Sequence, residues 1–414
     1  MSNPIAGASH PLRIAPALSG TTPPPVMEAR RWLEARPAGA KPELINVSQA
    51  APAAAPPEGL RMAMAEALLQ NPASHLYGPV LGLPALRQAL SDREQEIYRT
   101  DADTGPGPQH VAITAGCNQA FCAALMTVAA PGDDVIIPLP WYFNHAMWCQ
   151  MQGIGIQTLE PGPGLLPEPE AAARLIGPRT RAIVLVSPNN PGGVAYSPTL
   201  IRGFFDLCQR HGIALILDET YRDFLAADGP PHRLFDDPLW DQTLIQLYSF
   251  SKAHRLTGHR VGALIAGSSV LREIEKFLDT VTICASQVGQ IGALWGLRHL
   301  SGWLANERQE ILHRGRLMAT QIAQLPGWQL LGCGAYFAYL RHPFALSSDS
   351  LAPKLVSDAG ILLLPGTMFR PEGDAQAARE LRIAFANIDA EGITALCARL
   401  KTLEMQLAPV SASH

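Results

Sequence analysis

Lys252 lies in a segment whose residue types suit an aldehyde that carries a phosphate. Ser249 and Ser251 precede the lysine, and Arg260 follows it in the same stretch of chain. A lysine amine can form a Schiff base with an aldehyde, and two hydroxyl groups with a guanidinium can hold a phosphate dianion. The segment therefore predicts covalent chemistry at Lys252 beside an anion-binding site.

Asp218 is the second residue whose position suggests chemistry. It directly follows the apolar run 213–217, so we expect it at the carboxyl end of a buried strand, where open α/β sheets bind ligands. A carboxylate beside a pyridine nitrogen keeps that nitrogen protonated. An isolated aspartate would more simply cap a helix, but the lysine segment downstream favours the binding role.

Two turns that contain glycine can supply further contacts. Asn190 lies in the turn 187–193, directly after an apolar run. Such a turn is common in proteins, but its place after an expected strand indicates that it also faces a ligand. Residues 116–118 form a strand-to-helix junction, where backbone N–H groups can bind an anion.

Three of these segments, 187–193, 217–221 and 248–262, together resemble the aspartate-aminotransferase-like group of pyridoxal-phosphate enzymes. This group is also known as the fold type I, class I/II aminotransferases. The resemblance extends from about Ile45 to the C-terminal helix. Several separate motifs in the same order make it far more specific than any single match.

The resemblance implies one cofactor, pyridoxal 5′-phosphate, and three catalytic residues. Lys252 would carry the cofactor and then act as general acid and base between the substrate and the cofactor. Asp218 would hold the protonated ring nitrogen. Tyr221 would donate a hydrogen bond to the phenolic oxygen, and Asn190 would donate one from the other side.

The resemblance also implies a wider set of cofactor-binding residues. The set comprises Gly116, Cys117, Asn118, Tyr142, Asn190, Asp218, Tyr221, Ser249, Ser251, Lys252, Arg260 and Tyr77. Relatives usually carry a small or hydroxyl residue where this chain has Cys117. Tyr142 would stack on the pyridine ring, with Trp141 as a rival and an ordinary core aromatic as the alternative. Tyr77 would reach the cofactor phosphate of a neighbouring subunit.

Arg382 is the predicted anchor of the substrate. It lies inside the apolar run 381–386, where a charge is costly unless it is paired. A substrate α-carboxylate, held by a two-point fork, is a suitable partner, and an internal acid is the alternative. The resemblance favours the carboxylate and implies that Asn190 helps to orient it.

The substrate entrance departs from the family pattern. Ala50 and Ala51 stand in a stretch where many relatives have glycine, and we include both in the substrate-binding set. No motif places a second arginine for a dicarboxylate side chain. The candidates are Arg30, Arg31, Arg255 and Arg370.

The elements that must position these residues follow from hydrophobic patterning. Continuous apolar runs of strand length predict strands buried on both faces, as in a parallel sheet; they are 182–186, 213–217, 244–248 and 261–266. Helical stretches between most of them predict an α/β domain. The resemblance implies seven strands, flanked by helices.

A smaller α+β domain is expected after about residue 268. Helical segments are predicted at 271–278 and 289–325, and strand-like pieces follow, including one at 381–386. In the resembling family, N-terminal residues complete this domain. The predicted boundaries are an N-terminal segment at 1–55, a cofactor-binding domain at 56–290 and a small domain at 291–414.

Bulk properties narrow the class of protein. The net charge of −4 gives no sign of the strongly basic surface that proteins use to bind nucleic acid. Seven cysteines without metal-ligand spacing predict reduced thiols in the cytoplasm and no bound metal.

Residues 1–10 lack the pattern of a signal peptide, and no apolar run is long enough to span a membrane. A 47% hydrophobic content is compatible with the homodimer with shared active sites that the resemblance implies.

The predicted function is transfer of an amino group between an L-amino acid and a 2-oxo acid. A β-lyase, decarboxylase or cyclising enzyme of the same fold is the first alternative. A transcription regulator with an aminotransferase-like domain is a second, disfavoured because no basic helix-turn-helix pattern precedes the matched region. A degenerate binding protein is a third, disfavoured by the presence of Lys252, Asp218, Tyr221, Asn190 and Arg382.

Overall fold

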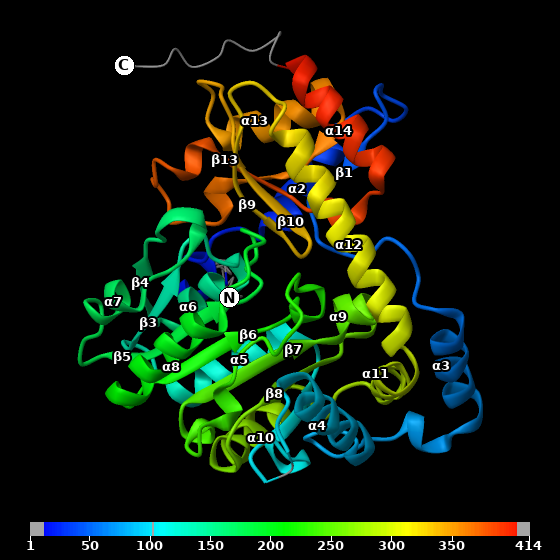
Figure 1. Ribbon diagram of the computed structural model, residues 1–414, viewed down its shortest axis with the longest axis vertical. Coiled ribbons are helices and arrows are strands. Elements are labelled where there is room, and N and C mark those ends of the chain that lie inside the picture. Colours follow the sequence, from blue (N-terminus) through cyan, green and yellow to red (C-terminus); the bar gives the residue numbers. More distant parts are fainter. Residues whose placement is uncertain (1–11, 102, 404–414) are drawn as a thin grey trace, which may run out of the picture.

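The described part of the chain folds around two main sheets, a large one below and a smaller one above, with a further pair of short strands beside the smaller one (Figure 1). The computed structural model describes residues 12–101 and 103–403. The N-terminal residues on which the expectation of no signal peptide rests therefore lie outside the described part. Among the described residues, no helix combines the length and the apolar character needed to cross a membrane.

The large sheet has seven strands in the order β2-β8-β7-β6-β5-β3-β4. The strands are β2 (Val111–Thr114), β3 (Asp134–Pro138), β4 (Gly155–Leu159), β5 (Thr180–Val186), β6 (Ala214–Asp218), β7 (Leu244–Ser249) and β8 (Gly262–Ile265). β8 is antiparallel to both of its neighbours, β2 and β7, while the pairs that β3, β4, β5, β6 and β7 form among themselves are parallel. The prediction of a mostly parallel, seven-stranded sheet is confirmed.

Both faces of this sheet are covered, which explains the uninterrupted apolar runs. In β5, Ile183 and Leu185 join one hydrophobic cluster, and Ala182 and Val184 join another on the opposite face. The first cluster includes residues of α3 (Glu58–Gln70), α4 (Pro84–Tyr98), α8 (Pro198–His211) and α11 (Gln287–His299). The second includes residues of α5 (Cys117–Val128), α6 (Phe143–Gln152) and α10 (Ser268–Thr282).

The small sheet is antiparallel and has the order β12-β13-β10-β9. Its strands are β9 (Gln329–Gly334), β10 (Phe337–Arg341), β12 (Leu364–Pro365) and β13 (Glu380–Ile383). The helices of this part are α12 (Ser301–Ile322), α13 (Ser348–Lys354) and α14 (Ala390–Leu403). In Figure 1, α12 runs from the lower part up beside this sheet.

N-terminal residues complete the upper part, as the resemblance implied. β1 (Ile45–Asn46) pairs in parallel with β11 (Ile361–Leu362), and α2 (Pro25–Glu34) contributes Ala29 to a cluster with residues of the small sheet. The chain then returns to the lower part with α3 (Figure 1). The exact domain boundaries stay a prediction.

The long helical segment predicted at 289–325 is wrong in one respect: it consists of two helices. Leu300 separates α11 from α12 with φ −108° and ψ 13°. The reason is tertiary, because α11 packs on α3 and α4 whereas α12 packs on β9 and α14. A single straight helix cannot make both sets of contacts.

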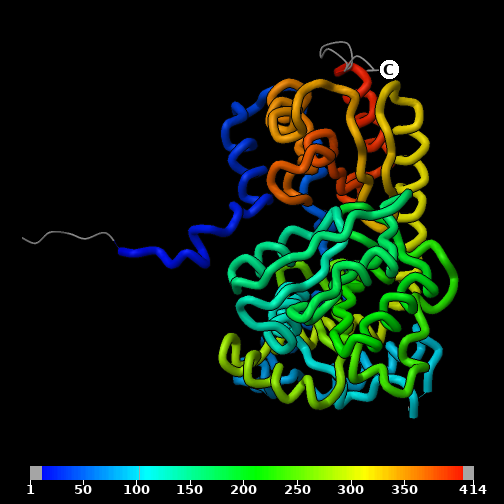
Figure 2. Tube along the Cα trace, turned by 90° about the vertical axis from the view of Figure 1, so that its left-hand side faces the viewer, coloured from blue at the N-terminus to red at the C-terminus, as the bar shows by residue number. Residues whose placement is uncertain are grey.

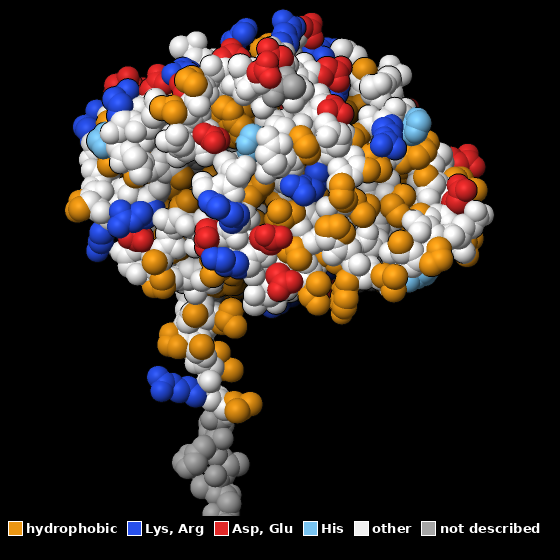
Figure 3. Space-filling model, turned by 90° about the horizontal axis from the view of Figure 1, so that it is seen from below, with side chains coloured by type: hydrophobic (Ala, Val, Ile, Leu, Met, Phe, Trp, Pro, Cys, Tyr) orange, Lys and Arg blue, Asp and Glu red, His pale blue; other side chains and the backbone are white. Residues whose placement is uncertain are grey.

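The first residues that the structure describes project from the body (Figure 2). Residues 12–20 are exposed throughout and include the short helix α1 (Pro16–Ser19). Leu12 and Leu18 expose 93% and 62% of their surface. Seen from below, the molecule carries positive and negative side chains next to one another, and the segment extends away from its body (Figure 3).

Candidate active site

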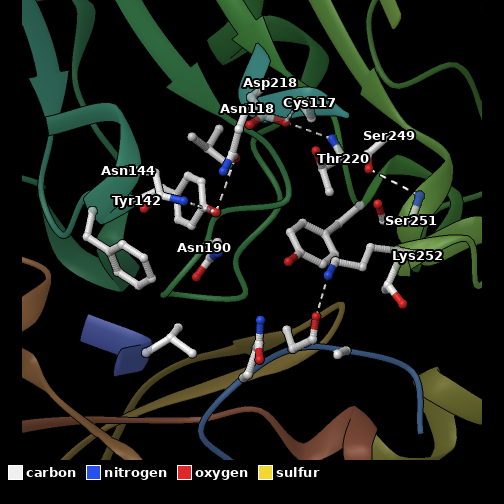
Figure 4. A pocket seen from close by; sticks show the side chains of 18 of the residues that line it. Cys117, Asn118, Tyr142, Asn144, Asn190, Asp218, Thr220, Ser249, Ser251 and Lys252 are labelled. Atoms are coloured by element: carbon white, nitrogen blue, oxygen red, sulfur yellow. Dashed lines mark hydrogen bonds between the residues drawn. The ribbon is translucent and has the colours of Figure 1, made fainter. Parts of the chain in front are cut away.

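A cavity of about 400 Å³ lies between the two sheets. Asp218 at the end of β6 and Ser249 at the end of β7 line it from below, and Arg382 of β13 lines it from the small sheet. The carboxyl ends of parallel strands meet at this edge, where ligands bind in open α/β sheets. Figure 4 shows the strand ends converging on the pocket.

The structure brings together most of the residues that the sequence predicts for the site. Those that line the cavity are Ala50, Ala51, Cys117, Asn118, Tyr142, Asn190, Asp218, Tyr221, Ser249, Ser251, Lys252, Arg260 and Arg382. Gly116 does not line the cavity itself but lies next to Arg260, which does. Tyr77 does not line the cavity and is 80% exposed.

Asp218 is buried with donors on both carboxylate oxygens. The Thr220 N–H donates to Oδ1 at 2.9 Å, the Cys117 thiol contacts the same oxygen at 3.6 Å, and His145 Nε2 lies 3.5 Å from Oδ2. Burial by itself raises the pKa of Asp218, but His145 and Thr220 outweigh it and hold the pKa below its ordinary value. The carboxylate therefore stays ionised at the cavity wall.

His145, which no motif of the sequence marked as a site residue, packs beside Asp218 with its Nε2 3.5 Å from Oδ2. Its ring stacks on Phe121 with centroids 3.8 Å apart and meets Tyr142 edge-on at 5.1 Å. The sequence held one signal for the position of His145. It follows the predicted site residue Tyr142 by three positions, and residues at that spacing share a face where the chain is helical.

Lys252 extends into the cavity from the short helix α9 (Phe250–Ala253), which Ser249 caps by accepting from the Ser251 N–H at 3.2 Å. Its Nζ donates to the carbonyl of Ala50 (Figure 4). Burial, and then the charges of Arg260 and Arg382, lower the pKa of Lys252 to about 8. The amine is therefore far closer to its nucleophilic, neutral form than an ordinary lysine.

One end of the cavity is suited to an anion. Arg260 lies against Gly116, where a Cβ would come 2.3 Å from Nη2 and where φ is +89°. Gly116 also caps α5 without a side-chain acceptor, so the first N–H groups of that helix are free to bind a ligand. No carboxylate of the described residues forms an ion pair with Arg260.

Arg382 is a buried cation, 2% exposed, without an acidic partner among the described residues. Its Nη1 donates to Asn190 Oδ1 at 2.9 Å and its Nη2 to the Ser48 carbonyl, while Nε has no partner. The guanidinium lies 5.1 Å from the ring centroid of Phe337 and 4.8 Å from that of Phe369. Burial lowers the pKa of Arg382 to about 10.

Tyr142 and Trp141 were the two candidates for the aromatic residue that stacks on the pyridine ring. Tyr142 lines it, and its hydroxyl accepts from Asn144 Nδ2 at 2.9 Å, while Trp141 belongs to the core cluster on one face of the large sheet. Tyr221 also lines the cavity and meets the Phe337 ring edge-on at 5.1 Å.

This donor set could hold a cofactor that combines a phosphate, an aldehyde and a ring nitrogen. The phosphate fits Arg260, Ser249, Ser251 and the start of α5, and the aldehyde fits Lys252. The ring nitrogen fits the ionised Asp218. No group of three His, Cys, Asp or Glu side chains in the described part of the chain could hold a metal ion.

Several lining residues were not predicted from the sequence. They are Pro24, Val26, Gln49, Phe143, Asn144, Val186, Thr220 and Thr257. Most of them carry ordinary side chains without a motif. Only their place between the two sheets makes them part of the site.

The chain matches the family model for aminotransferase class I and II over residues 42–400. It is 30% identical to the aromatic aminotransferase ISS1 of Arabidopsis thaliana, over 81% of this chain and 83% of that protein. It is 27% identical to an aspartate aminotransferase of Pyrococcus horikoshii, over 79% and 83%. Among solved structures, the fold is similar to an aspartate aminotransferase mutant of Thermus thermophilus, with a TM-score of 0.84 and 24% identity over 95% of this chain and all of that one.

Proposed function

The chain belongs to the class I and II aminotransferase family and is an aminotransferase, and we propose that it transfers an amino group between an L-amino acid and a 2-oxo acid with pyridoxal phosphate bound at Lys252. One observation carries the proposal. A lysine with a lowered pKa lines the same cavity as a buried arginine that has no acidic partner within residues 12–101 and 103–403. The first suits an aldehyde and the second suits the α-carboxylate of an amino acid.

Each residue has a task that its surroundings support. When bound, pyridoxal phosphate supplies an electron sink for the α-carbon of the substrate. Arg382 and Asn190 hold the α-carboxylate and so orient the bond that breaks. Lys252 Nζ accepts the α-proton and later returns it, because a pKa near 8 suits both directions of transfer.

Asp218 acts on the ring and not on the substrate. Its ionised carboxylate, held by His145 and Thr220, keeps a proton on the ring nitrogen. Tyr221 and Asn190 are proposed as donors to the phenolic oxygen, and Tyr142 as the ring that stacks on the pyridine. Arg260, Ser249, Ser251 and the start of α5 hold the phosphate.

We further propose a homodimer whose active sites are shared. Two exposed features support it: Tyr77 at 80% exposure, and the projecting segment 12–20 with Leu12 and Leu18. Large exposed apolar groups of this kind are typical of surfaces that meet a partner. All seven cysteines are free, which supports a reducing, cytoplasmic location.

The test is a pair of half-reactions with the purified holoenzyme. An amino acid without a 2-oxo acid should remove the visible absorbance of the cofactor and release one equivalent of 2-oxo acid. Adding a different 2-oxo acid should restore the absorbance and yield its amino acid. Release of carbon dioxide, or of a group from the substrate β-carbon, would instead indicate another reaction of this fold.

A further inference from the structure

A buried ion pair close to Arg382 has no task in the proposed function, on which this inference rests. The pair joins Arg370 to Glu380, whose exposed fractions are 3% and 1%, with Arg370 Nε 3.0 Å from Glu380 Oε2. Neither residue lines the cavity. Because a buried ion pair loses the hydration of both charges, its presence two positions from the proposed carboxylate anchor calls for a physical reason.

Glu380 and Arg382 belong to the same face of the small sheet. They lie two positions apart on β13 (Figure 1), and side chains at this spacing point to one face, about 6.6 Å apart along the strand. Tyr339 of β10 lies directly opposite Arg382 in the antiparallel pair, which places it on that face as well. The side chains of a glutamate and an arginine are long enough to meet across this gap.

Glu380 is nevertheless held by other donors. Its Oε2 accepts from the Tyr339 hydroxyl at 2.8 Å and from Arg370 Nε at 3.0 Å, and its Oε1 lies 3.9 Å from Arg341 Nη2. The ion pairs of Glu380 in the described part of the chain are therefore with Arg370 and Arg341. The acid that shares a strand face with Arg382 is turned away from it.

Arg370 is itself fixed by three further acceptors. Its Nη1 donates to Asp374 Oδ2 at 3.0 Å and to Glu160 Oε2 at 3.2 Å, and its Nη2 donates to Gln376 Oε1 at 3.4 Å. Burial by itself lowers the pKa of Arg370, but Glu380 and the other acidic neighbours outweigh it and raise the pKa above its ordinary value. Arg370 therefore stays charged and cannot leave Glu380 without breaking several bonds.

Without these donors, Glu380 would be a buried carboxylate near the buried guanidinium of Arg382. An unpaired buried charge is costly, so the carboxylate would pair with Arg382 across the gap. That pair would occupy the N–H groups that receive the α-carboxylate of a substrate in a two-point fork. A substrate would then have to break an internal ion pair before it could bind.

We propose that Arg370, together with the Tyr339 hydroxyl, holds Glu380 away from Arg382 and so keeps Arg382 free for the α-carboxylate of the substrate. Arg370 is a positioning residue, because it acts through Glu380 and lies outside the cavity lining. The effect is specific to ligands that carry a carboxylate, since an amine without one makes no use of Arg382. Arg370, a sequence candidate for binding a substrate side chain, thus has a different task.

Calorimetric titrations of the holoenzyme with 3-phenylpropanoate, 4-methylpentanoate and succinate test the proposal without turnover. Arg370→Gln releases Glu380 and should raise the Kd of the carboxylates that bind the wild type by on the order of tenfold. In half-reactions the KM of amino acids should rise likewise, while kcat/KM for 2-phenylethylamine should stay within about twofold. Every comparison uses the same assembled holoenzyme, so whatever a second copy contributes to the cavity is common to all variants.

Removal of the acid as well should restore carboxylate binding. Arg370→Gln combined with Glu380→Gln leaves no carboxylate at position 380 to compete for Arg382, and its Kd should return to within about threefold of the wild-type value. Lost packing alone would instead make the second change add to the first. Arg370→Gln combined with Glu160→Gln is the matched control. Glu160 contacts the same arginine but is 57% exposed, and its removal should leave the tenfold loss in place.

Tyr339→Phe is a milder variant that keeps the proposal testable if Arg370→Gln does not fold. It keeps the buried ring and removes only the hydrogen bond to Glu380. The Kd of the same carboxylates should rise by about threefold or more. Glu380→Gln in the same chain should restore it.

The outcomes separate this inference from the proposed function. Wild-type carboxylate affinity in both Arg370→Gln and Tyr339→Phe would overturn the inference and leave the function intact. A loss that Glu380→Gln deepens would overturn it as well. A wild type that binds the carboxylates but converts no amino acid would overturn the proposed function, while the titrations would still decide the inference. A wild type that binds no carboxylate would overturn the role of Arg382 and the inference with it.

Discussion

At the scale of single residues, Arg382 is buried and pairs with no acidic side chain in the described part of the chain. A cation in such a place is costly unless a ligand pairs with it. We expect Arg382→Ala to lower kcat/KM for amino acids by on the order of a hundredfold, mainly through KM. Steady-state kinetics measure this. Amines that lack a carboxylate should be largely indifferent, and an equal loss for both substrate types would make Arg382 structural.

Lys252 allows a prediction with a defined pH. Its pKa of about 8 lies below the ordinary lysine value, so the neutral amine becomes the major form as pH rises through about 8. The rate at which the cofactor-free protein attaches pyridoxal phosphate should therefore rise with a midpoint near 8. Borohydride trapping at a series of pH values measures it, and peptide mapping should place the adduct on Lys252. Lys252→Ala should give no adduct, and a midpoint near 10.5 would contradict the prediction.

Asp218 is expected to act through its charge. Asp218→Asn keeps the size of the side chain but removes the charge that protonates the ring nitrogen. The variant should fold and bind cofactor yet transaminate very poorly, as measured in the amino-acid half-reaction. Near-normal turnover would mean that Asp218 only holds the backbone N–H of Thr220.

At the scale of elements, the start of α5 couples a backbone conformation to the anion site. Gly116 has a φ of +89°, and a Cβ there would come within 2.3 Å of Arg260 Nη2. Gly116→Ala should therefore strain the turn and displace the guanidinium. We expect cofactor affinity to fall by about tenfold or more, measured by fluorescence titration of the cofactor-free protein.

Gly258→Ala is the matched control for this element. Gly258 lies two residues before Arg260, and a Cβ there meets nothing within 4 Å. Its cofactor affinity should stay at the wild-type value. If Gly116→Ala also kept that value, the phosphate would not be bound at this turn.

At the scale of the whole molecule, the proposed dimer gives a role to the exposed Tyr77 and to the projecting segment 12–20. If Tyr77 meets the partner's cofactor phosphate as proposed, Tyr77→Glu sets a negative charge against that phosphate. Because Tyr77 is 80% exposed, the change should leave the fold of its own subunit intact. The variant should lose activity and, on sedimentation, remain a dimer.

Mixing two inactive variants gives a decisive test of sharing. When Tyr77→Glu and Lys252→Ala subunits exchange at random, half of the dimers are mixed, and each mixed dimer has one site without either lesion. Activity should return to roughly a quarter of wild type. Proven exchange without recovery would show that Tyr77 serves its own site or none.

The sequence by itself determined the features that depend on neighbours along the chain. The apolar runs predicted the buried strands of a mostly parallel sheet, because a strand covered on both faces needs no alternation. Asp218 could be placed at a strand end because it directly follows such a run. The segment around Lys252 indicated its chemistry through residue types alone.

Only the tertiary structure decided the features that join distant segments. His145 meets Asp218, Arg382 meets Ser48 and Asn190, and Leu300 divides two helices because their packing partners differ. Val26 and Phe143 carry no motif, yet the packing of α2 and α6 beside the small sheet places both in the lining of the cavity. Local patterns report which residues are buried or near a turn, whereas the contacts between remote residues depend on how the two sheets and their helices pack against each other.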